Sequence, residues 1–497
     1  MFTKVIFLVI FFAVMIGVGI YSRKHATNVN DFVLGGRSVG PWLTAFAYGT
    51  SYFSAVVFVG YAGQFGYKYG LSATWIGIGN AIIGSLLAWV ILGSRTRSMS
   101  KALSAATMPD FFGKRYDSNG LKIAASAISF IFLIPYTASV YNGLSRLFGM
   151  AFDIPYAVCV IAMAALTGIY VIMGGYMATA INDFIQGIIM LIGIVAVIMA
   201  VLNGQGGFYE AVRSLSEIES DIPLTMGQKG VFASFFGPDF PNLLGVVVLT
   251  SLGTWGLPQM VHKFYAIRDE KAIRYGTIIS TLFAMVVSGG CYYLGGFARL
   301  FDTPAIYTED GSIIYDAIIP SILSTLPDLL IGIVIVLVLS ASMSTLSSLV
   351  LTSSSTLTLD LIKGNLIKDM DEKKQLLYMR ILLVFFIVIS VIIALDPPTF
   401  IAQLMGISWG ALAGAFLAPF MYGLYWKGVT KAAVWASFAC GVLLTVSNMF
   451  LKFIASPINA GAIVMLAGLV IVPVVSLLTP KMEKGKVDKI FTCLEEK

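Results

Sequence analysis

Charged side chains are scarce in this sequence of 497 residues. Only 12% of the residues are Asp, Glu, Lys or Arg, whereas 58% are hydrophobic, and the mean hydropathy is +0.88. A soluble globular domain carries roughly twice that share of charge, so the composition excludes the soluble classes. Most apolar runs exceed the roughly 18 residues of a membrane-spanning helix and lack the alternation of outer-membrane strands. The sequence therefore predicts an all-α polytopic membrane protein.

Cysteine and histidine are also rare. The four cysteines show no CxxC spacing, which excludes a disulfide framework and a structural zinc site. The segment Gly406-Ile-Ser-Trp-Gly410 matches the GxSxG pattern of hydrolases, but it lies in an apolar helical run, and only His25 and His262 could serve as a base. No HExxH or P-loop motif is present. We therefore expect no enzymatic activity and no use of ATP by this chain.

Hydropathy and turn signals predict about 13 membrane spans. They cover residues 2–22, 41–66, 70–93, 121–149, 154–174, 178–203, 241–263, 272–300, 328–360, 374–395, 398–425, 429–454 and 460–480. Fewer than about 20 residues follow the last span, too few for a further domain. Function is therefore expected to lie inside the bundle.

Lysine and arginine are concentrated in the loops that follow odd-numbered spans. These residues include Arg23, Lys24, Arg37, Arg95, Arg97, Lys263, Arg268, Lys363 and Lys368. By the positive-inside rule these loops face the cytoplasm, so the N-terminus lies outside and the C-terminus inside a bacterial-type cytoplasmic (inner) membrane. The rule also accounts for the net charge of +6, and no nucleic acid is expected as a partner.

Two spans are interrupted by polar or helix-breaking residues. The second contains Ala45-Phe-Ala-Tyr-Gly-Thr-Ser-Tyr-Phe-Ser54, and the seventh contains Thr250-Ser-Leu-Gly-Thr-Trp-Gly-Leu-Pro-Gln259. The odd offset between these spans inverts one relative to the other, as two five-helix inverted repeats require. Backbone groups freed at such breaks bind ions and substrates where they line a cavity. The alternative is that the small residues serve helix packing alone.

The ninth span contains a hydroxyl-rich block, Ala341-Ser-Met-Ser-Thr-Leu-Ser-Ser348, within a run of Ile, Leu and Val. Helical spacing places Ala341, Ser344, Thr345 and Ser348 on one face, with Ser347 alongside Ser344. Hydroxyl and carbonyl oxygens suit a monovalent cation that is released in each cycle, whereas carboxylate cages bind too tightly. The alternative is that each hydroxyl bonds to the preceding helical turn.

Asp183 is the clearest acidic residue at membrane depth, at the start of the sixth span. A carboxylate inside a membrane is costly and indicates a function. Capping of the helix by this acid is the alternative, since the helix dipole favours an acid in the first turn. Coupling to protons through Asp183, and a cation-permeable channel, also remain open as functions of such a bundle.

Taken together, these motifs resemble the sodium:solute symporter family over nearly the whole chain. The matching stretches are the GGY…ND…Q pattern from Gly174 to Gln186, the hydroxyl block ending at Ser348, and Gly253 to Pro258. The resemblance implies a leucine-transporter-like core of ten helices in two inverted repeats. In this single transporter domain, the extra N-terminal helix is 2–22, the first repeat is 41–203, the inverted second repeat is 241–425, two peripheral helices span 429–480, and the cytoplasmic tail is 481–497.

The resemblance also implies where sodium binds. The main site would comprise the backbone carbonyls of Thr50 and Phe53 with Ala341, Ser344 and Thr345. A further site in some members would here comprise Ser344, Ser347, Ser348 and Asp183, and because all four are present, two sodium ions per cycle are favoured over one.

For the solute, the resemblance points to more than one branch of the family. Residues 51–60 and 67–70 look like the pantothenate branch, and Tyr136 matches a substrate-site tyrosine of the proline branch. Thr250 and Thr254 stand where that branch has aromatic residues, which speaks against proline. The fourth span has no mid-membrane arginine of the kind that sialic-acid carriers use.

The expected function is import of a small organic solute with sodium by alternating access, the solute being pantothenate-like, another small carboxylate or an amino acid. Sodium, the solute and the lipid bilayer are the expected partners, and no obligate protein partner is expected. The candidate substrate-binding residues are Tyr52, Ser54, Gln64, Trp75, Tyr136, Thr250, Thr254, Trp255 and Gln259.

Overall fold

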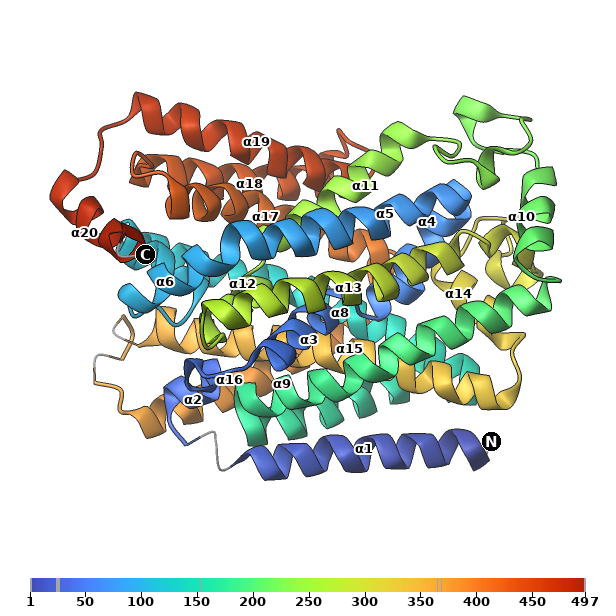
Figure 1. Ribbon diagram of the computed structural model, residues 1–497, viewed down its shortest axis with the longest axis horizontal. Coiled ribbons are helices and arrows are strands. Elements are labelled where there is room, and N and C mark those ends of the chain that lie inside the picture. The colour runs from blue at the N-terminus through green and yellow to red at the C-terminus, as the bar shows by residue number, and fades with distance from the viewer. Residues whose placement is uncertain (1, 24–26, 153, 364, 368, 496–497) are drawn as a thin grey trace.

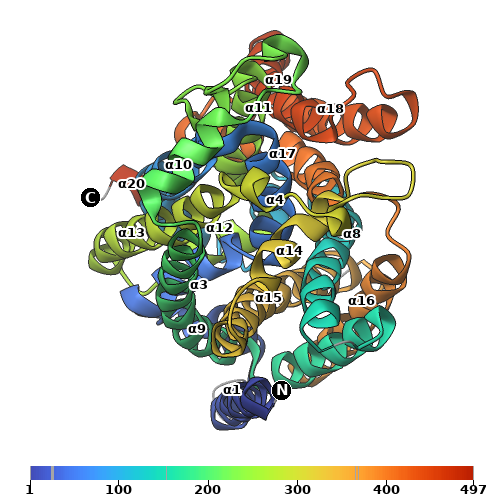
Figure 2. The same cartoon turned by 90° about the vertical axis from the view of Figure 1, so that its right-hand side faces the viewer.

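The computed structural model describes residues 2–23, 27–152, 154–363, 365–367 and 369–495. Within these ranges the regular elements are all helices, with three isolated bridges and no β-strand. The long helices run side by side along one axis (Figure 1), and the end-on view shows them as a single bundle (Figure 2). The predicted all-α class is confirmed. Of the basic loop residues, Lys24 and Lys368 lie outside the described residues.

The first half of the bundle is built from ten helices. They are α1 (Phe2–Ser22), α2 (Val29–Leu34), α3 (Pro41–Tyr52), α4 (Ala62–Tyr69), α5 (Thr74–Gly79), α6 (Ser94–Ala102), α7 (Met108–Arg115), α8 (Asn119–Phe152), α9 (Tyr156–Gly204) and α10 (Phe208–Glu217). Wider π-helical turns at Val56–Tyr61, Asn80–Leu87 and Trp89–Gly93 join the pieces between α3 and α6.

The second half contributes another ten helices. They are α11 (Phe240–Leu252), α12 (Pro258–Ala266), α13 (Glu270–Gly295), α14 (Ile318–Ser324), α15 (Asp328–Thr356), α16 (Glu372–Leu395), α17 (Ile401–Tyr425), α18 (Lys431–Leu451), α19 (Pro457–Leu478) and α20 (Lys484–Glu495). In both views α1 lies at one edge of the bundle and α18 and α19 lie at the opposite edge.

The described residues form fewer separate membrane-length helices than the sequence predicts spans, because some helices cover two predicted spans. Among the described residues, 10 helices are long and apolar enough to cross a membrane, or 11 if α11 and α12, bent by 46°, form one span. The sequence predicts about 13. Helix α9 covers two predicted spans as two helical parts that meet at a kink at Gly175, where φ is 54° and the backbone is not helical. Residues Val56–Ala102 likewise join part of the second predicted span to the third.

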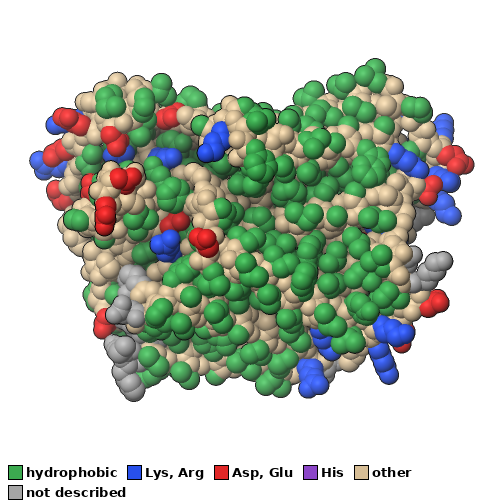
Figure 3. Space-filling view, turned by 180° about the vertical axis from the view of Figure 1, so that it is seen from behind, with side chains coloured by type: hydrophobic (Ala, Val, Ile, Leu, Met, Phe, Trp, Pro, Cys, Tyr) green, Lys and Arg blue, Asp and Glu red, His purple; other side chains and the backbone are tan. Residues whose placement is uncertain are grey.

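Hydrophobic side chains cover the middle of the face drawn in Figure 3, and charged side chains gather at its two ends. Large apolar residues such as Val9 and Ile192 are more than half exposed on the outer helices α1 and α9. In water such an apolar surface would promote aggregation, whereas in lipid it is the expected surface of a membrane protein. Helices α15 and α17 are the most enclosed of the spanning helices, so polar residues on them face protein.

The backbones of α4 and α13 touch at a pair of glycines. A Cβ atom at Gly66 would lie 2.1 Å from the backbone carbonyl of Gly295, and backbone cannot yield as a flexible side chain can. We expect Gly66→Ala to lower the stability of the protein by about 1–3 kcal/mol, the usual cost of overpacking. Thermal unfolding of the purified protein in detergent measures this. Gly17→Ala is the control, because a Cβ there meets nothing within 4 Å. Equal unfolding temperatures for the two variants would contradict the close approach.

Candidate functional site

The two predicted breaks meet in the centre of the bundle. Helix α3 ends at Tyr52, and Phe53 after it has an extended backbone. Helix α11 ends before a short 3-10 turn at Gly253–Gly256, and α12 begins at Pro258. The Tyr52 hydroxyl donates to the carbonyl of Thr250, so the first break is tied to the residues just before the second.

The hydroxyl block of α15 faces the end of α3. Ser344 Oγ lies 2.9 Å from the Thr50 carbonyl oxygen and 3.1 Å from that of Ala341. Thr345 Oγ1 lies 3.3 Å from the Thr50 carbonyl oxygen and 3.1 Å from that of Ala341. All four residues are buried. Two hydroxyls and two carbonyls thus converge across two helices, without a carboxylate.

This donor set fits a sodium ion. Uncharged oxygens bind a monovalent cation weakly enough for release, and the described residues contain no cluster of three His, Cys, Asp or Glu side chains that would favour a di- or trivalent metal. Four of the five positions predicted for the main site are therefore brought together. The fifth, Phe53, is buried one residue beyond the end of α3.

Two of the four residues predicted for a further sodium site, Ser348 and Asp183, lie beside a lysine. Lys263 Nζ donates to Ser348 Oγ at 2.9 Å and lies 3.8 Å from Asp183 Oδ2. Ser347 Oγ instead donates to the carbonyl of Ser344 within its own helix, at 2.9 Å. Ser348 Oγ is also 2.7 Å from Ser51 Oγ. Hydroxyls of α15 thus connect Lys263 to the end of α3.

The placement of Lys263 corrects the sequence analysis, which put this residue in a cytoplasmic loop. Its side chain is only 2% exposed, because α12 continues past it to Ala266. The signal in the sequence is the uncharged run Phe264–Ile267, which separates Lys263 from Arg268. The positive-inside rule counts charges near span ends and does not resolve which of them enter the bundle.

Asp183 does not cap a helix. It lies eight residues after the kink at Gly175, beyond the first turn of the helical part of α9 that follows this kink, and is completely buried. The capping alternative is therefore wrong. Neither carboxylate oxygen has a hydrogen-bond partner among the described residues, so the Lys263 ammonium is the charge that faces it.

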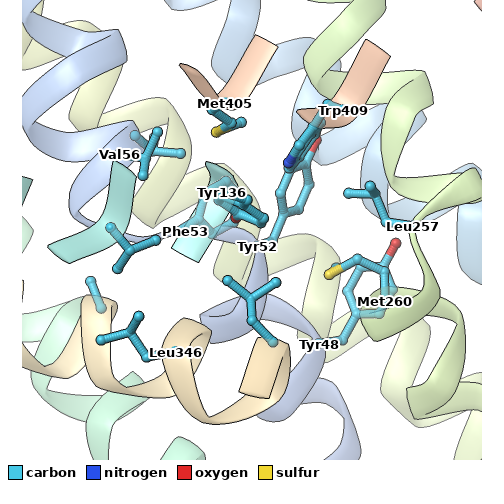
Figure 4. Close-up of a cluster of buried hydrophobic side chains, with 14 of the residues drawn as sticks. Tyr48, Tyr52, Phe53, Val56, Tyr136, Leu257, Met260, Leu346, Met405 and Trp409 are labelled. Carbon is cyan, nitrogen blue, oxygen red and sulfur yellow. The ribbon is translucent and has the colours of Figure 1, made fainter. Parts of the chain in front are cut away.

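An aromatic cluster lies beside the breaks (Figure 4). Trp409 of α17 stacks on Tyr52 with ring centroids 6.1 Å apart and meets Tyr136 of α8 edge-on at 5.8 Å. In Figure 4, Phe53 lies on one side of these three rings and Leu257 on the other. The Tyr136 hydroxyl and the Trp409 indole nitrogen are buried and have no hydrogen-bond partner within the described chain. Such groups are available to a polar solute.

Sequence reasoning missed Trp409 because the Gly406–Gly410 stretch was weighed only as a hydrolase motif. The glycines there have a packing role, since a Cβ at Gly410 would lie 2.9 Å from the Cα of Gly461 in α19. A tryptophan in the middle of the predicted span 398–425 was the available signal, because its indole N–H requires a partner when it is buried.

Several other predicted substrate residues hold the breaks in shape. Thr250 and Thr254 hydroxyls donate to the carbonyls of Val246 and Ser251, at 2.9 and 3.0 Å. Ser54 Oγ accepts the backbone N–H of Val56 at 3.1 Å. The Thr250 and Ser54 hydroxyls therefore bond local backbone, and the Thr254 hydroxyl also lies 3.2 Å from the carbonyl oxygen of Gly84.

The two tryptophans on the candidate list donate to backbone carbonyls outside the aromatic cluster. Trp255 Nε1 donates to the carbonyl of Ile83 at 3.0 Å, between the seventh and third predicted spans. Trp75 Nε1 donates to the carbonyl of Phe235 in the loop before α11, also at 3.0 Å. The structure does not bring Trp75 to the cluster.

Both glutamines on the candidate list keep unpartnered polar atoms. Gln259 is 1% exposed, and neither its amide oxygen nor its nitrogen has a partner in the part of the chain that is described. Gln64 Oε1 is likewise unpartnered, and Gln64 lines a cavity of about 470 Å³ together with Lys68, Asp239 and other residues at the ends of α4, α11 and α17. This cavity therefore extends from the end of the bundle to Gln64, one of the candidate substrate-binding residues.

Comparison with known proteins shows which family this chain resembles in sequence. The model of the sodium:solute symporter family matches residues 32–441. A sodium/proline symporter of Staphylococcus aureus (strain JH9) is 31% identical over 455 residues, covering 89% of this chain and 85% of that protein.

Solved structures show the fold. A sodium-coupled sialic acid symporter, solved in a substrate-bound outward-open state, superposes with a TM-score of 0.80 at 18% identity, over 97% of this chain and 99% of that one. A transporter of the nucleobase-cation-symport-1 family superposes with a TM-score of 0.55 at 14% identity, over 92% and 97%. The fold is leucine-transporter-like. The family model and the relative together show that this membrane-embedded chain belongs to the sodium:solute symporter family.

Proposed function

We propose that this protein imports a small organic solute together with sodium by alternating access. The observation that carries the proposal is the pair of hydroxyls on Ser344 and Thr345, both directed at the Thr50 carbonyl where α3 approaches its break. A sodium ion among these oxygens would hold α15 against α3, and its release would let the two helices separate. Ion binding would thereby be coupled to movement of the broken span that also contacts the solute.

The solute that fits this cluster is small and partly polar. The rings of Tyr52, Tyr136 and Trp409 offer apolar faces. The Gln259 amide, at the start of α12 after the second break, has no partner among the described residues and offers an N–H donor and a carbonyl acceptor. An amide N–H binds a carboxylate or carbonyl oxygen. We propose a pantothenate-like compound, another small carboxylate or an amino acid. The curated relative is a sodium/proline symporter, which keeps proline among the amino acids to be tested.

The proposed orientation has the N-terminus outside and the C-terminus inside a bacterial-type cytoplasmic membrane. In that orientation, a potential of about 100 mV supplies roughly 2.3 kcal/mol per sodium ion, and a tenfold sodium gradient adds about 1.4 kcal/mol. One ion therefore drives about 500-fold accumulation of a neutral solute. The repeats 41–203 and 241–425 are part of this proposal, and each contains one of the two breaks.

The test is uptake into proteoliposomes of labelled proline, pantothenate, short monocarboxylates and sialic acid, with sodium and proton gradients imposed separately. We expect uptake of one compound to require sodium. Uptake driven only by protons would contradict the proposal and favour coupling through Asp183. A sodium flux that needs no solute and does not saturate would instead indicate a channel.

A further inference from the structure

We infer that the ammonium group of Lys263 fills the second cation position beside Ser348 and Asp183, so that the protein carries one sodium ion per cycle and not two. This inference rests on the proposed sodium-coupled function and specifies its ion stoichiometry. The resemblance to the family favoured two ions because Ser344, Ser347, Ser348 and Asp183 are all present. The structure adds a fifth residue to that set.

The surroundings of Lys263 Nζ form a cation site. Its ligands are Ser348 Oγ at 2.9 Å, Asp183 Oδ2 at 3.8 Å and the face of the Tyr176 ring, whose centroid is 5.3 Å away. A hydroxyl, a carboxylate and an aromatic face are each attractive to a positive charge. They come from α15 and α9, whereas the lysine comes from α12, so the charge is delivered to the site from a third helix.

The burial of Lys263 and Asp183 strengthens the interaction between their charges. Asp183 is fully buried and Lys263 is 2% exposed. With neither Asp183 oxygen hydrogen-bonded within the described residues, the carboxylate depends on the nearby cation for its stability. A sodium ion on the same oxygens would place two positive charges within a few ångströms of one carboxylate, which a water-poor interior disfavours. The lysine and a sodium ion therefore exclude one another at this position.

The lysine also connects the two broken spans. It is carried by α12, which begins at the second break, and it bonds Ser348, whose hydroxyl is 2.7 Å from that of Ser51. Ser51 follows Thr50, the residue whose carbonyl faces the main sodium site. A tethered ammonium at this point thus replaces a mobile ion as the link between α12, α15 and the end of α3.

The experiment counts sodium ions bound to the purified full-length protein in detergent, with ²²Na⁺ alone as the probe. We expect one ion per wild-type protein and two for Lys263→Gln, which removes the charge and leaves the Asp183 carboxylate. Lys263→Arg keeps the charge and should stay at one. Lys263→Gln combined with Asp183→Asn should return to one, because the second position then has no carboxylate.

The outcomes separate the inference from the proposed function. Two ions on the wild-type protein, or one ion on a folded Lys263→Gln variant, would overturn the role of the lysine and leave sodium coupling intact. No sodium binding to the wild-type protein would overturn the proposed function itself. If Lys263→Gln does not fold, as judged by gel filtration and thermal unfolding, the wild-type count and the Lys263→Arg count still decide between one ion and two.

Discussion

The double variant Ser344→Ala, Thr345→Ala is expected to lose sodium-dependent uptake. The two hydroxyls are the side-chain oxygens that α15 turns towards the Thr50 carbonyl, so alanine at both positions leaves a cation with backbone carbonyls alone. If each hydroxyl contributes about 1.4 kcal/mol, as a hydrogen-bonding group at a charge does, each loss raises the half-saturating sodium concentration about tenfold and both raise it about 100-fold.

The measurement is the sodium dependence of solute uptake in proteoliposomes, accompanied by ²²Na⁺ binding in detergent. The matched control is Ser354→Ala, Ser355→Ala on the same helix, because these hydroxyls donate to the carbonyl of Leu351 within α15. The control should keep its sodium affinity within about twofold, a change of about 0.4 kcal/mol. Unchanged sodium affinity in the Ser344 and Thr345 variant would show that the cation binds elsewhere.

Removal of the Trp409 side chain is expected to weaken solute binding while sodium binding persists. Trp409 joins Tyr52 and Tyr136 into one aromatic surface, and its indole N–H is buried without a partner among the described residues. Truncation of a buried aromatic residue costs about 3–5 kcal/mol in a well-packed core. Because we propose that this site opens to admit a solute, we expect a smaller effect than in a closed core, a rise of about 10- to 100-fold in KM.

The readouts for Trp409→Ala are KM for the solute found by the uptake screen and ²²Na⁺ binding to the same preparation. Trp409→Phe should recover part of the affinity, since it restores a ring but no donor. Trp435→Ala is the control for loss of a tryptophan, because that side chain is 44% exposed on α18. An equal loss of sodium and solute binding in Trp409→Ala would mean that the residue supports the fold only.

The sequence alone could identify some of the functional polar residues, because they lie within long apolar helices. A serine or threonine within an apolar run, as at Ser344 and Thr345, stands out because membrane burial makes an unsatisfied hydroxyl costly. The spacing along one helix then gives the face. For the same reason the breaks at Phe53 and Gly253–Gly256 were visible, since glycine, proline and polar residues interrupt an apolar span.

Residues whose role depends on a partner from a distant helix were not visible in the same way. In the sequence Gly66 is an ordinary small residue. The structure shows that a Cβ atom there would lie 2.1 Å from the backbone carbonyl of Gly295 in α13. Trp409 belongs to the aromatic cluster only because Tyr136 of α8 and Tyr52 at the end of α3 reach it. Long-range packing, which composition does not encode, set both roles.

The sequence by itself determined the membrane class, the helical architecture, the two interrupted spans and the hydroxyl face of α15, because each depends on hydrophobic length or helical period within one segment. Only the tertiary structure decided that Lys263 turns inward to Asp183 and Ser348. A charge near the end of a span satisfies the positive-inside rule whether it faces water or a buried carboxylate. That choice rests on where α9, α12 and α15 meet, which is a property of the assembled bundle.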